Sequence, residues 1–180
     1  LSSLPRVRSV VVVDHLPVFG GVTVTPLEVE SRSVARQADQ PWAMRTGTSA
    51  RYFETAAIPL VIGRALAPTD RDDALSVVVV NRELARRYFG SADQAVGRRI
   101  SLGRTDVPAV WRVIVGVVGD TRPADITAPP NPELYVPLAQ EPARNVSFML
   151  RAPGGDASAA AIRGLMHEID PALAVYELRT

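Results

Sequence analysis

The chain has 180 residues and a formal net charge of +1, a balance that gives no electrostatic preference for nucleic acid or for acidic lipid. It contains no cysteine, and all of its basic residues other than two histidines are arginine. Disulfides, thiolate nucleophiles, cysteine zinc sites, Schiff-base lysines and the lysine of a Walker A phosphate loop are therefore excluded. The length suffices for one large domain or two small ones.

Strand patterns dominate the first third of the chain. Apolar and β-branched residues predict strands over residues 7–15, 22–30 and 42–49. The pair Gly20-Gly21 suits a tight turn and predicts that the first two of these strands form a hairpin. A short helix is predicted over residues 52–57, because Pro59 disfavours helical backbone at the residue before it.

The segment from residue 76 onward carries the clearest local signals. Four consecutive valines at 77–80 are apolar toward both sides, and they predict a strand that is buried on both faces. Asn81 suits the N-cap of a helix over residues 82–89, and Gly90 suits its left-handed C-terminus. Within this helix the apolar residues share one face and the arginines lie on the opposite face, as in an amphipathic surface helix.

The remainder of the chain is predicted as strands with one further helix. The strands lie around Ile100 and over residues 111–119, 133–138, 147–151 and 175–178. Prolines flank the strand over 133–138, which predicts an edge strand because proline cannot donate a ladder hydrogen bond. Asp156 suits the N-cap of a helix that ends before Pro171. Because strands and helices do not alternate regularly, the sequence indicates an α+β fold.

Few residues suggest chemistry. His15 follows Asp14 at the end of a strand, but one histidine and one aspartate are too few for a zinc site, and His167 is expected on a solvated helix face. The acidic residues at 70, 72 and 73 do not have the spacing of an EF-hand loop. Residues 116–120 lack the glycine spacing of a dinucleotide-binding loop. We therefore assign no catalytic, cofactor-binding or metal-binding residue.

Five blocks of sequence resemble, in order, the periplasmic core domain of MacB-like and FtsX-like ABC transporter permeases, of the kind predicted in acidobacteria. The blocks are residues 52–64, 76–103, 117–122, 129–140 and 169–180. They include the Tyr52-Phe53 pair, the turn Val117-Val-Gly-Asp-Thr-Arg122 and the closing strand after Pro171. The resemblance therefore extends over almost the whole chain.

The resemblance implies a bipartite domain. A porter-like lobe of β-α-β elements would use residues 1–50 and 142–180, and a sabre-like α/β lobe would be inserted over residues 51–141. No run of about 18 apolar residues occurs in the chain. The nearest candidate, residues 110–118, is shorter than this and is interrupted by Arg112. In the family this domain lies between two transmembrane helices, and these are expected outside the present sequence, with the domain on the periplasmic side of the inner membrane.

The function implied by the resemblance is non-catalytic. The domain would couple ATP hydrolysis, carried out by a separate cytoplasmic subunit or domain, to movements in the periplasm during export, efflux or lipoprotein handling. Its implied partners are that ATP-binding subunit, a second permease in a dimer, and a periplasmic adaptor or lipoprotein; no nucleic acid is implied. A related role is the regulation of cell-wall hydrolases.

Two regions are candidates for a partner interface. One is the helix face that carries Arg82, Arg86 and Arg87, and the other is the stiff loop that contains Pro129 and Pro130. The alternative to the permease is a free-standing hydrolase or small-molecule-binding α+β protein. A deep pocket in which Asp14, His15 and a serine converge would favour this alternative.

Overall fold

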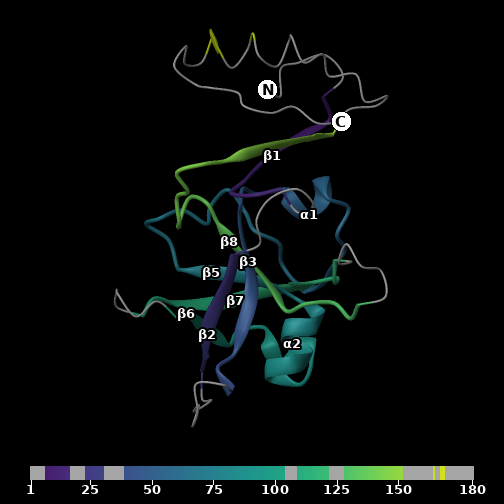
Figure 1. Ribbon diagram of the computed structural model, residues 1–180, viewed down its shortest axis with the longest axis vertical. Coiled ribbons are helices and arrows are strands. Elements are labelled where there is room, and N and C mark those ends of the chain that lie inside the picture. The colour runs from purple at the N-terminus through teal and green to yellow at the C-terminus, as the bar shows by residue number, and fades with distance from the viewer. Residues whose placement is uncertain are drawn as a thin grey trace.

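The computed structural model describes residues 7–16, 23–30, 39–103, 109–121 and 128–151, together with residues 164, 167 and 168. The strands are β1 Ser9–Val13, β2 Thr23–Val29, β3 Trp42–Thr48, β4 Leu60–Gly63, β5 Val77–Asn81, β6 Arg99–Leu102, β7 Trp111–Val118, β8 Glu133–Pro137 and β9 Ser147–Arg151. The helices are α1 Tyr52–Thr55, α2 Arg82–Phe89 and α3 Ala92–Ala95. This mixture of many strands and few short helices confirms the α+β class (Figure 1).

A small closed barrel forms the centre of the molecule. Its strands follow the order β2-β6-β7-β5-β8-β3, and β3 pairs again with β2 to close the ring. The β5–β7 and β3–β8 pairs are parallel, and the other pairs in the ring are antiparallel. Closure leaves no open edge along the ring, and β4 extends the sheet by pairing with the second half of β7.

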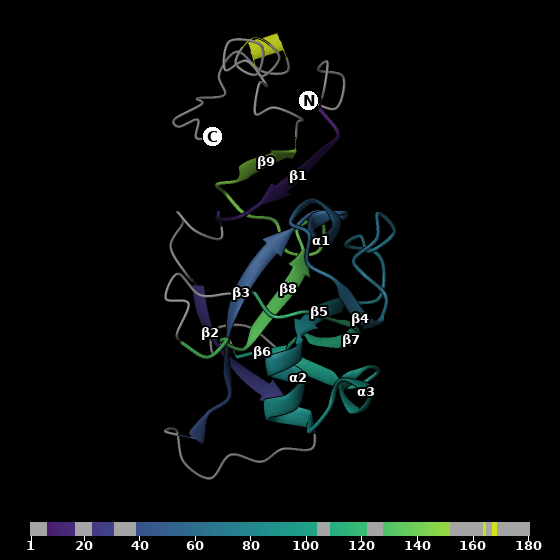
Figure 2. The ribbon, with the colours of Figure 1, turned by 90° about the vertical axis from the view of Figure 1, so that its right-hand side faces the viewer.

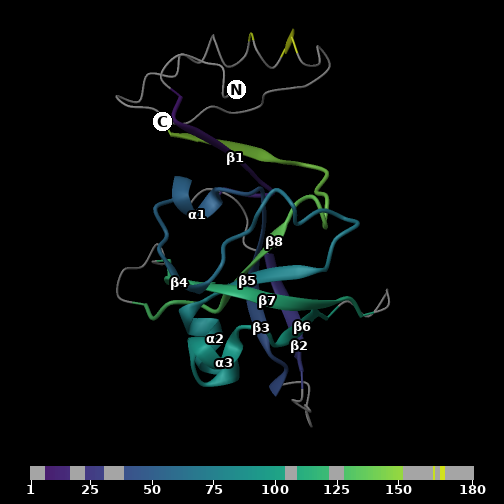
Figure 3. The ribbon, with the colours of Figure 1, turned by 180° about the vertical axis from the view of Figure 1, so that it is seen from behind.

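A two-stranded arm extends from the barrel. In the arm, β1 and β9 pair antiparallel along their full lengths, from Ser9 opposite Arg151 to Val13 opposite Ser147. The arm pairs with the barrel strands at a single register position, Val13 opposite Thr48 on β3. Figure 2 shows the arm at the opposite end of the described structure from α2 and α3, and Figure 3 shows the same arrangement from behind.

The valine strand β5 is buried on both faces, as its sequence predicted. Val78 and Val80 belong to the cluster inside the barrel, together with Leu84 and Ala85 of α2. Val77 and Val79 face the other way, into a second cluster that α1 and β1 complete. Each face of β5 thus serves one core, because successive side chains of a strand point to opposite sides.

Helix α2 begins and ends at the residues that its sequence predicted. The side chain of Asn81 accepts a hydrogen bond from the backbone N–H of Leu84, and Gly90 ends the helix at a φ of 91°. The four-residue helix α3 follows at once, with Ser91 as its N-cap. Both α3 and β4 are elements that the sequence patterns did not predict.

Two expectations about strand pairing are wrong. The first two strands do not form a hairpin among the described residues, because the edges of β2 are taken by β3 and β6. Strand β8 is not an edge strand, since it pairs with β3 on one side and β5 on the other. Its prolines do not prevent this position because Pro132 precedes the strand and Pro137 is its last residue.

The expected division into two lobes stays a prediction. The predicted border between the lobes, at residues 50 and 51, falls between β3 and α1. Strand β3, on one side of this border, belongs to the same barrel as β5 to β8 on the other side. The predicted helix that Asp156 begins and the predicted closing strand over 175–178 lie outside the described residues. Among the residues that are described, no helix has both the length and the apolar character needed to cross a bilayer.

Candidate partner interface

Helix α2 presents its arginines to solvent. Arg82, Arg86 and Arg87 are exposed, whereas Leu84 and Ala85 on the opposite face are buried in the barrel cluster. Arg86 forms a two-pronged ion pair with Glu83, at 2.9 Å for both N–O contacts. Arg86 is 68% exposed, and ion pairs of this kind contribute little to stability.

The proline loop lies beside the start of α2, although it is far away in the sequence. The side-chain amide of Asn81 donates to the carbonyl of Asn131 at 2.8 Å, and its oxygen accepts from the backbone N–H of Glu133 at 2.9 Å. Pro129 is exposed and Pro130 is half-buried. Asn81 therefore brings together the two regions that the sequence singled out.

Arg87 differs from the other two arginines because it lies over aromatic rings. Its guanidinium carbon lies 5.3 Å from the ring centre of Trp42 and 5.8 Å from that of Tyr88. Tyr88 and Phe89, the two residues after Arg87, line an open groove of about 440 Å³. Its other lining residues are Glu30, Gln94 and Arg98. The surface around α2 thus combines arginines, aromatic side chains and a groove, a composition typical of protein interfaces.

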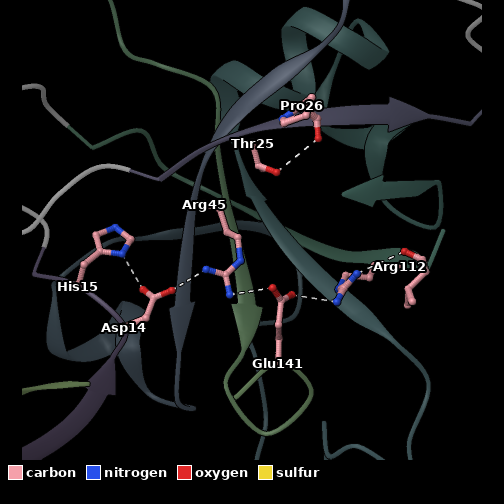
Figure 4. A network of polar contacts seen from close by, with 8 residues as sticks. Asp14, His15, Thr25, Pro26, Arg45, Arg112 and Glu141 are labelled. Atoms are coloured by element: carbon pink, nitrogen blue, oxygen red, sulfur yellow. Dashed lines mark hydrogen bonds and ion pairs between the residues drawn. The ribbon is translucent and has the colours of Figure 1, made fainter. Parts of the chain in front are cut away.

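A row of charged side chains crosses from the arm to the barrel, and the sequence patterns did not identify it (Figure 4). Asp14 Oδ2 contacts Arg45 Nη1 at 2.7 Å, Arg45 Nη2 contacts Glu141 Oε1 at 3.0 Å, and Glu141 Oε2 contacts Arg112 Nη2 at 2.9 Å. We call these four residues the charge chain. A signal was present in the sequence, because Arg112 interrupts an otherwise apolar strand.

The charge chain is largely shielded from water. The side chains of Asp14, Arg45 and Arg112 are only 10%, 14% and 9% exposed. Burial lowers the pKa of Arg112, and the charge of Glu141 opposes this shift. For Asp14 burial raises the pKa, but hydrogen bonds from His15 and from the Gly47 backbone and the charge of Arg45 together hold it below its ordinary value.

The arrangement around His15 does not resemble a hydrolytic site. His15 Nδ1 lies 2.7 Å from Asp14 Oδ1, but the cavity beside the histidine has a volume of only about 60 Å³. The residues that line this cavity include no serine; they are His15, Met44, Thr46, Tyr52, Thr121, Glu133 and Tyr135. Small-molecule sites usually need about 300 Å³ or more. Burial also raises the pKa of Tyr52 to about 12, so its hydroxyl stays protonated at neutral pH.

The acidic residues after Pro68 do not converge on a common point. Asp70 is buried and binds Arg64 through both carboxylate oxygens, at 2.9 and 2.8 Å, and also accepts from the N–H of Ala67. Asp72 and Asp73 are exposed. Within the described part of the chain, no three histidine, aspartate or glutamate side chains are grouped as metal ligands. His167, the second histidine, is exposed.

We expect the stability of the domain to fall at acid pH through Asp14 and Asp70. The pKa of both carboxyls is held below the ordinary value of 3.8, so the unfolded chain takes up protons at a higher pH than the folded one. Their contribution is therefore complete above about pH 4 and is lost as the pH falls through the lowered pKa values. Urea unfolding at a series of pH values should show this decline, and Asp70→Asn should flatten it. A slope that Asp70→Asn leaves unchanged would contradict the assignment to Asp70.

One family model and several solved structures match this chain. The family model described as MacB-like periplasmic core domain matches residues 3–167. A comparison with curated proteins gave no match.

Solved structures share the fold at low sequence identity. The periplasmic region of MacB from Actinobacillus actinomycetemcomitans is 19% identical, with a TM-score of 0.62 over 93% of this chain and 70% of that chain. A domain of a putative permease from Porphyromonas gingivalis is 12% identical, with a TM-score of 0.61 over 96% and 68% of the two chains. The extracellular domain of the noncanonic ABC-type transporter YknZ from Gram-positive bacteria is 14% identical, with a TM-score of 0.60 over 99% and 84%.

Proposed function

The chain belongs to the family of MacB-like periplasmic core domains, and on this basis we propose that it is the extracytoplasmic domain of an ABC transporter permease. It lies on the periplasmic side of a bacterial inner membrane and performs no catalysis of its own. ATP is hydrolysed by a separate cytoplasmic subunit or domain, and the membrane segments of the permease carry the resulting movement to this domain. The match of the family model over residues 3–167 carries the proposal.

The geometry of the arm supports this role. Strand β1 begins beside the end of β9, where the backbone N–H of Arg8 donates to the carbonyl of Arg151 at 2.8 Å. Arg8, before β1, and Arg151, at the end of β9, are thus neighbours. A domain inserted between two membrane segments needs this arrangement, because a movement of the two segments then acts on a single unit.

The arginine face of α2 and the proline loop form the proposed docking surface of this domain. Asn81 joins the start of α2 to residues 128–133. The arm and α2 occupy opposite ends of the structure (Figure 2). A surface so far from the arm is suited to contact with a second permease or with a periplasmic adaptor or lipoprotein. Export, efflux or lipoprotein handling is the process that such a contact serves.

Thiol labelling tests both the location and the docking surface. This chain has no cysteine, so Leu75→Cys or Arg86→Cys, made in the full-length permease, introduces one cysteine into this domain. The two positions are matched in exposure, at 67% for Leu75 and 68% for the side chain of Arg86. We expect a membrane-impermeant maleimide to label Leu75→Cys in cells whose inner membrane is intact, and to label Arg86→Cys more slowly because a partner covers it.

The two parts of the proposal fail separately in this experiment. Labelling of Leu75→Cys only after the inner membrane is broken would place the domain in the cytoplasm and overturn the proposed function. Equal labelling rates at the two positions in intact cells would leave the location in place and would remove α2 from the docking surface. The unsubstituted protein is the control for cysteines elsewhere in the full-length chain.

A further inference from the structure

We propose that the charge chain Asp14–Arg45–Glu141–Arg112 is the joint that holds the β1–β9 arm at a fixed orientation on the barrel. This inference rests on the proposed function, since a domain that transmits movement needs a stiff connection between the part that is moved and the part that docks. The charge chain is not used by the docking surface, and no catalytic role is assigned to it.

Backbone contacts alone give the arm a narrow attachment. Only Val13 of β1 is in register with a barrel strand, and the bonds around it run from Ser49 N–H to the carbonyl of Val12 and from Asp14 N–H to the carbonyl of Gly47, each at 2.9 Å. In the described residues β9 pairs with β1 and with no barrel strand. Val11 and Val13 of β1 also pack in the second cluster against Val79 of β5, but apolar contacts are not directional. Few directed bonds of the backbone therefore oppose a rotation of the arm on the barrel.

The charge chain connects the barrel to the residue after β1 and to the segment that leads into β9. Asp14 is the first residue after β1, and Glu141 lies in the segment that leads from β8 to β9. Their carboxylates are held by Arg45 of β3 and Arg112 of β7, as Figure 4 shows. Asp14 thus bonds the end of β1 directly to the barrel, and Glu141 holds Arg45 from the turn after β8, where its own N–H donates to the carbonyl of Pro137 at 3.0 Å.

The arginines approach from inside the barrel. Arg45 lies two residues after Ala43, and Arg112 lies two residues before Ile114, so each shares a strand face with a residue of the barrel cluster. Their charges alternate with those of the carboxylates; the Asp14–Arg45 and Glu141–Arg112 contacts are charge-assisted hydrogen bonds, and the Arg45–Glu141 contact between them is an ion pair. Such bonds have strict geometry, so they resist a change in the angle between the arm and the barrel.

Gly47 provides independent support for the joint. A Cβ atom at this position would lie 2.8 Å from Asp14 Oδ2 and 2.9 Å from Leu138 Cδ2. Side chains do not approach a Cβ atom this closely, so a residue larger than glycine requires the Asp14 carboxylate, the Leu138 side chain or both to shift. The absence of a side chain on β3 at this point leaves room for the Asp14 carboxylate where it contacts Arg45.

Distance measurements between spin labels on the 180-residue chain test the joint. Two cysteines introduced by Asp93→Cys on α3 and Arg151→Cys on β9 place exposed labels on the barrel side and on the arm. We expect a single narrow distance distribution for the otherwise unchanged chain. Gly47→Ala and Glu141→Gln should each broaden or split this distribution, because the first crowds Asp14 without removing a charge and the second leaves Arg112 without its carboxylate.

A matched control and a fold check accompany the measurement. Asp70→Asn breaks a buried ion pair that does not connect the arm to the barrel, and it should leave the distribution narrow. Far-ultraviolet circular dichroism verifies that each variant is folded. Narrow, unshifted distance distributions in both Gly47→Ala and Glu141→Gln would contradict the proposed joint. A broadening in Asp70→Asn equal to that in these two variants would contradict it as well. Because no transporter is needed for this experiment, its result is separate from the labelling result that decides the proposed function.

Discussion

Replacing Asn81 by alanine should lower the free energy of unfolding by about 3 kcal/mol, the sum of a lost helix cap and of two partly buried backbone groups left without partners. The side chain of Asn81 is fully buried and makes three hydrogen bonds, with Leu84 N–H, Glu133 N–H and the carbonyl of Asn131. It therefore joins the start of α2 to β8 and to the proline loop. Urea unfolding followed by circular dichroism measures the effect.

Two further variants separate the contributions of this side chain. Asn81→Asp keeps the oxygen that accepts from Leu84 and Glu133 but places a buried carboxylate oxygen against the carbonyl of Asn131, so at neutral pH its effect should equal or exceed that of Asn81→Ala. The effect should shrink at acid pH, where the protonated carboxyl can donate to Asn131. Ser91→Ala removes the N-cap of the short, exposed helix α3 and is the matched control, with an expected cost of about 1 kcal/mol or less. An Asn81→Ala effect no larger than that of Ser91→Ala would contradict the buried role of Asn81.

Replacing Gly116 by alanine should cost roughly 3 kcal/mol, because it overpacks a contact between two backbones. A Cβ atom on Gly116 would lie 2.1 Å from the carbonyl oxygen of Arg64 and 3.0 Å from its nitrogen and carbonyl carbon. Gly116 is in register with Gly63, so β4 and β7 meet here through two glycines and neither strand can yield by a side-chain rotation. The substitution should separate β4 from β7.

Amide hydrogen exchange locates this effect. The N–H of Arg64 donates to the carbonyl of Val115 at 2.9 Å, and it should lose protection in Gly116→Ala before amides of the barrel strands do. Gly164→Ala is the control, because a Cβ atom there meets none of the described residues within 4 Å and the residue is helical. This control should be neutral or stabilising by up to about 1 kcal/mol. Unchanged protection of Arg64 in Gly116→Ala would refute the close approach of the two strands.

Local sequence signals predicted the elements that are stabilised by residues close by in the sequence. Helix α2 was predicted with its cap at Asn81 and its end at Gly90, because both residues act on backbone groups a few positions away. The burial of β5 on both faces followed from its valines. By contrast, β4 contains two exposed apolar residues, Leu60 and Val61, and only its pairing with β7 makes it a strand.

The candidate interface was predicted in part. The exposure of Arg82, Arg86 and Arg87 followed from the helical period, which places them opposite the apolar face. Their proximity to the proline loop could not be predicted, because Asn81 and Asn131 are 50 positions apart. The cation–π contact of Arg87 with Trp42 depends in the same way on two distant segments. Whether this surface binds a partner remains a prediction.

The sequence by itself determined the α+β class, most strands, the caps of α2 and the resemblance that the family match then confirmed. These features depend on residue type and on short spacings, which act within a few residues of each other. Only the tertiary structure decided that the strands close into a barrel, that β8 is central, and that Asp14, Arg45, Glu141 and Arg112 meet in a row. The physical reason is that strand pairing and buried charge contacts join separate segments of the chain, such as Asp14 with Arg45 and Arg112 with Glu141, and no local pattern specifies such partners.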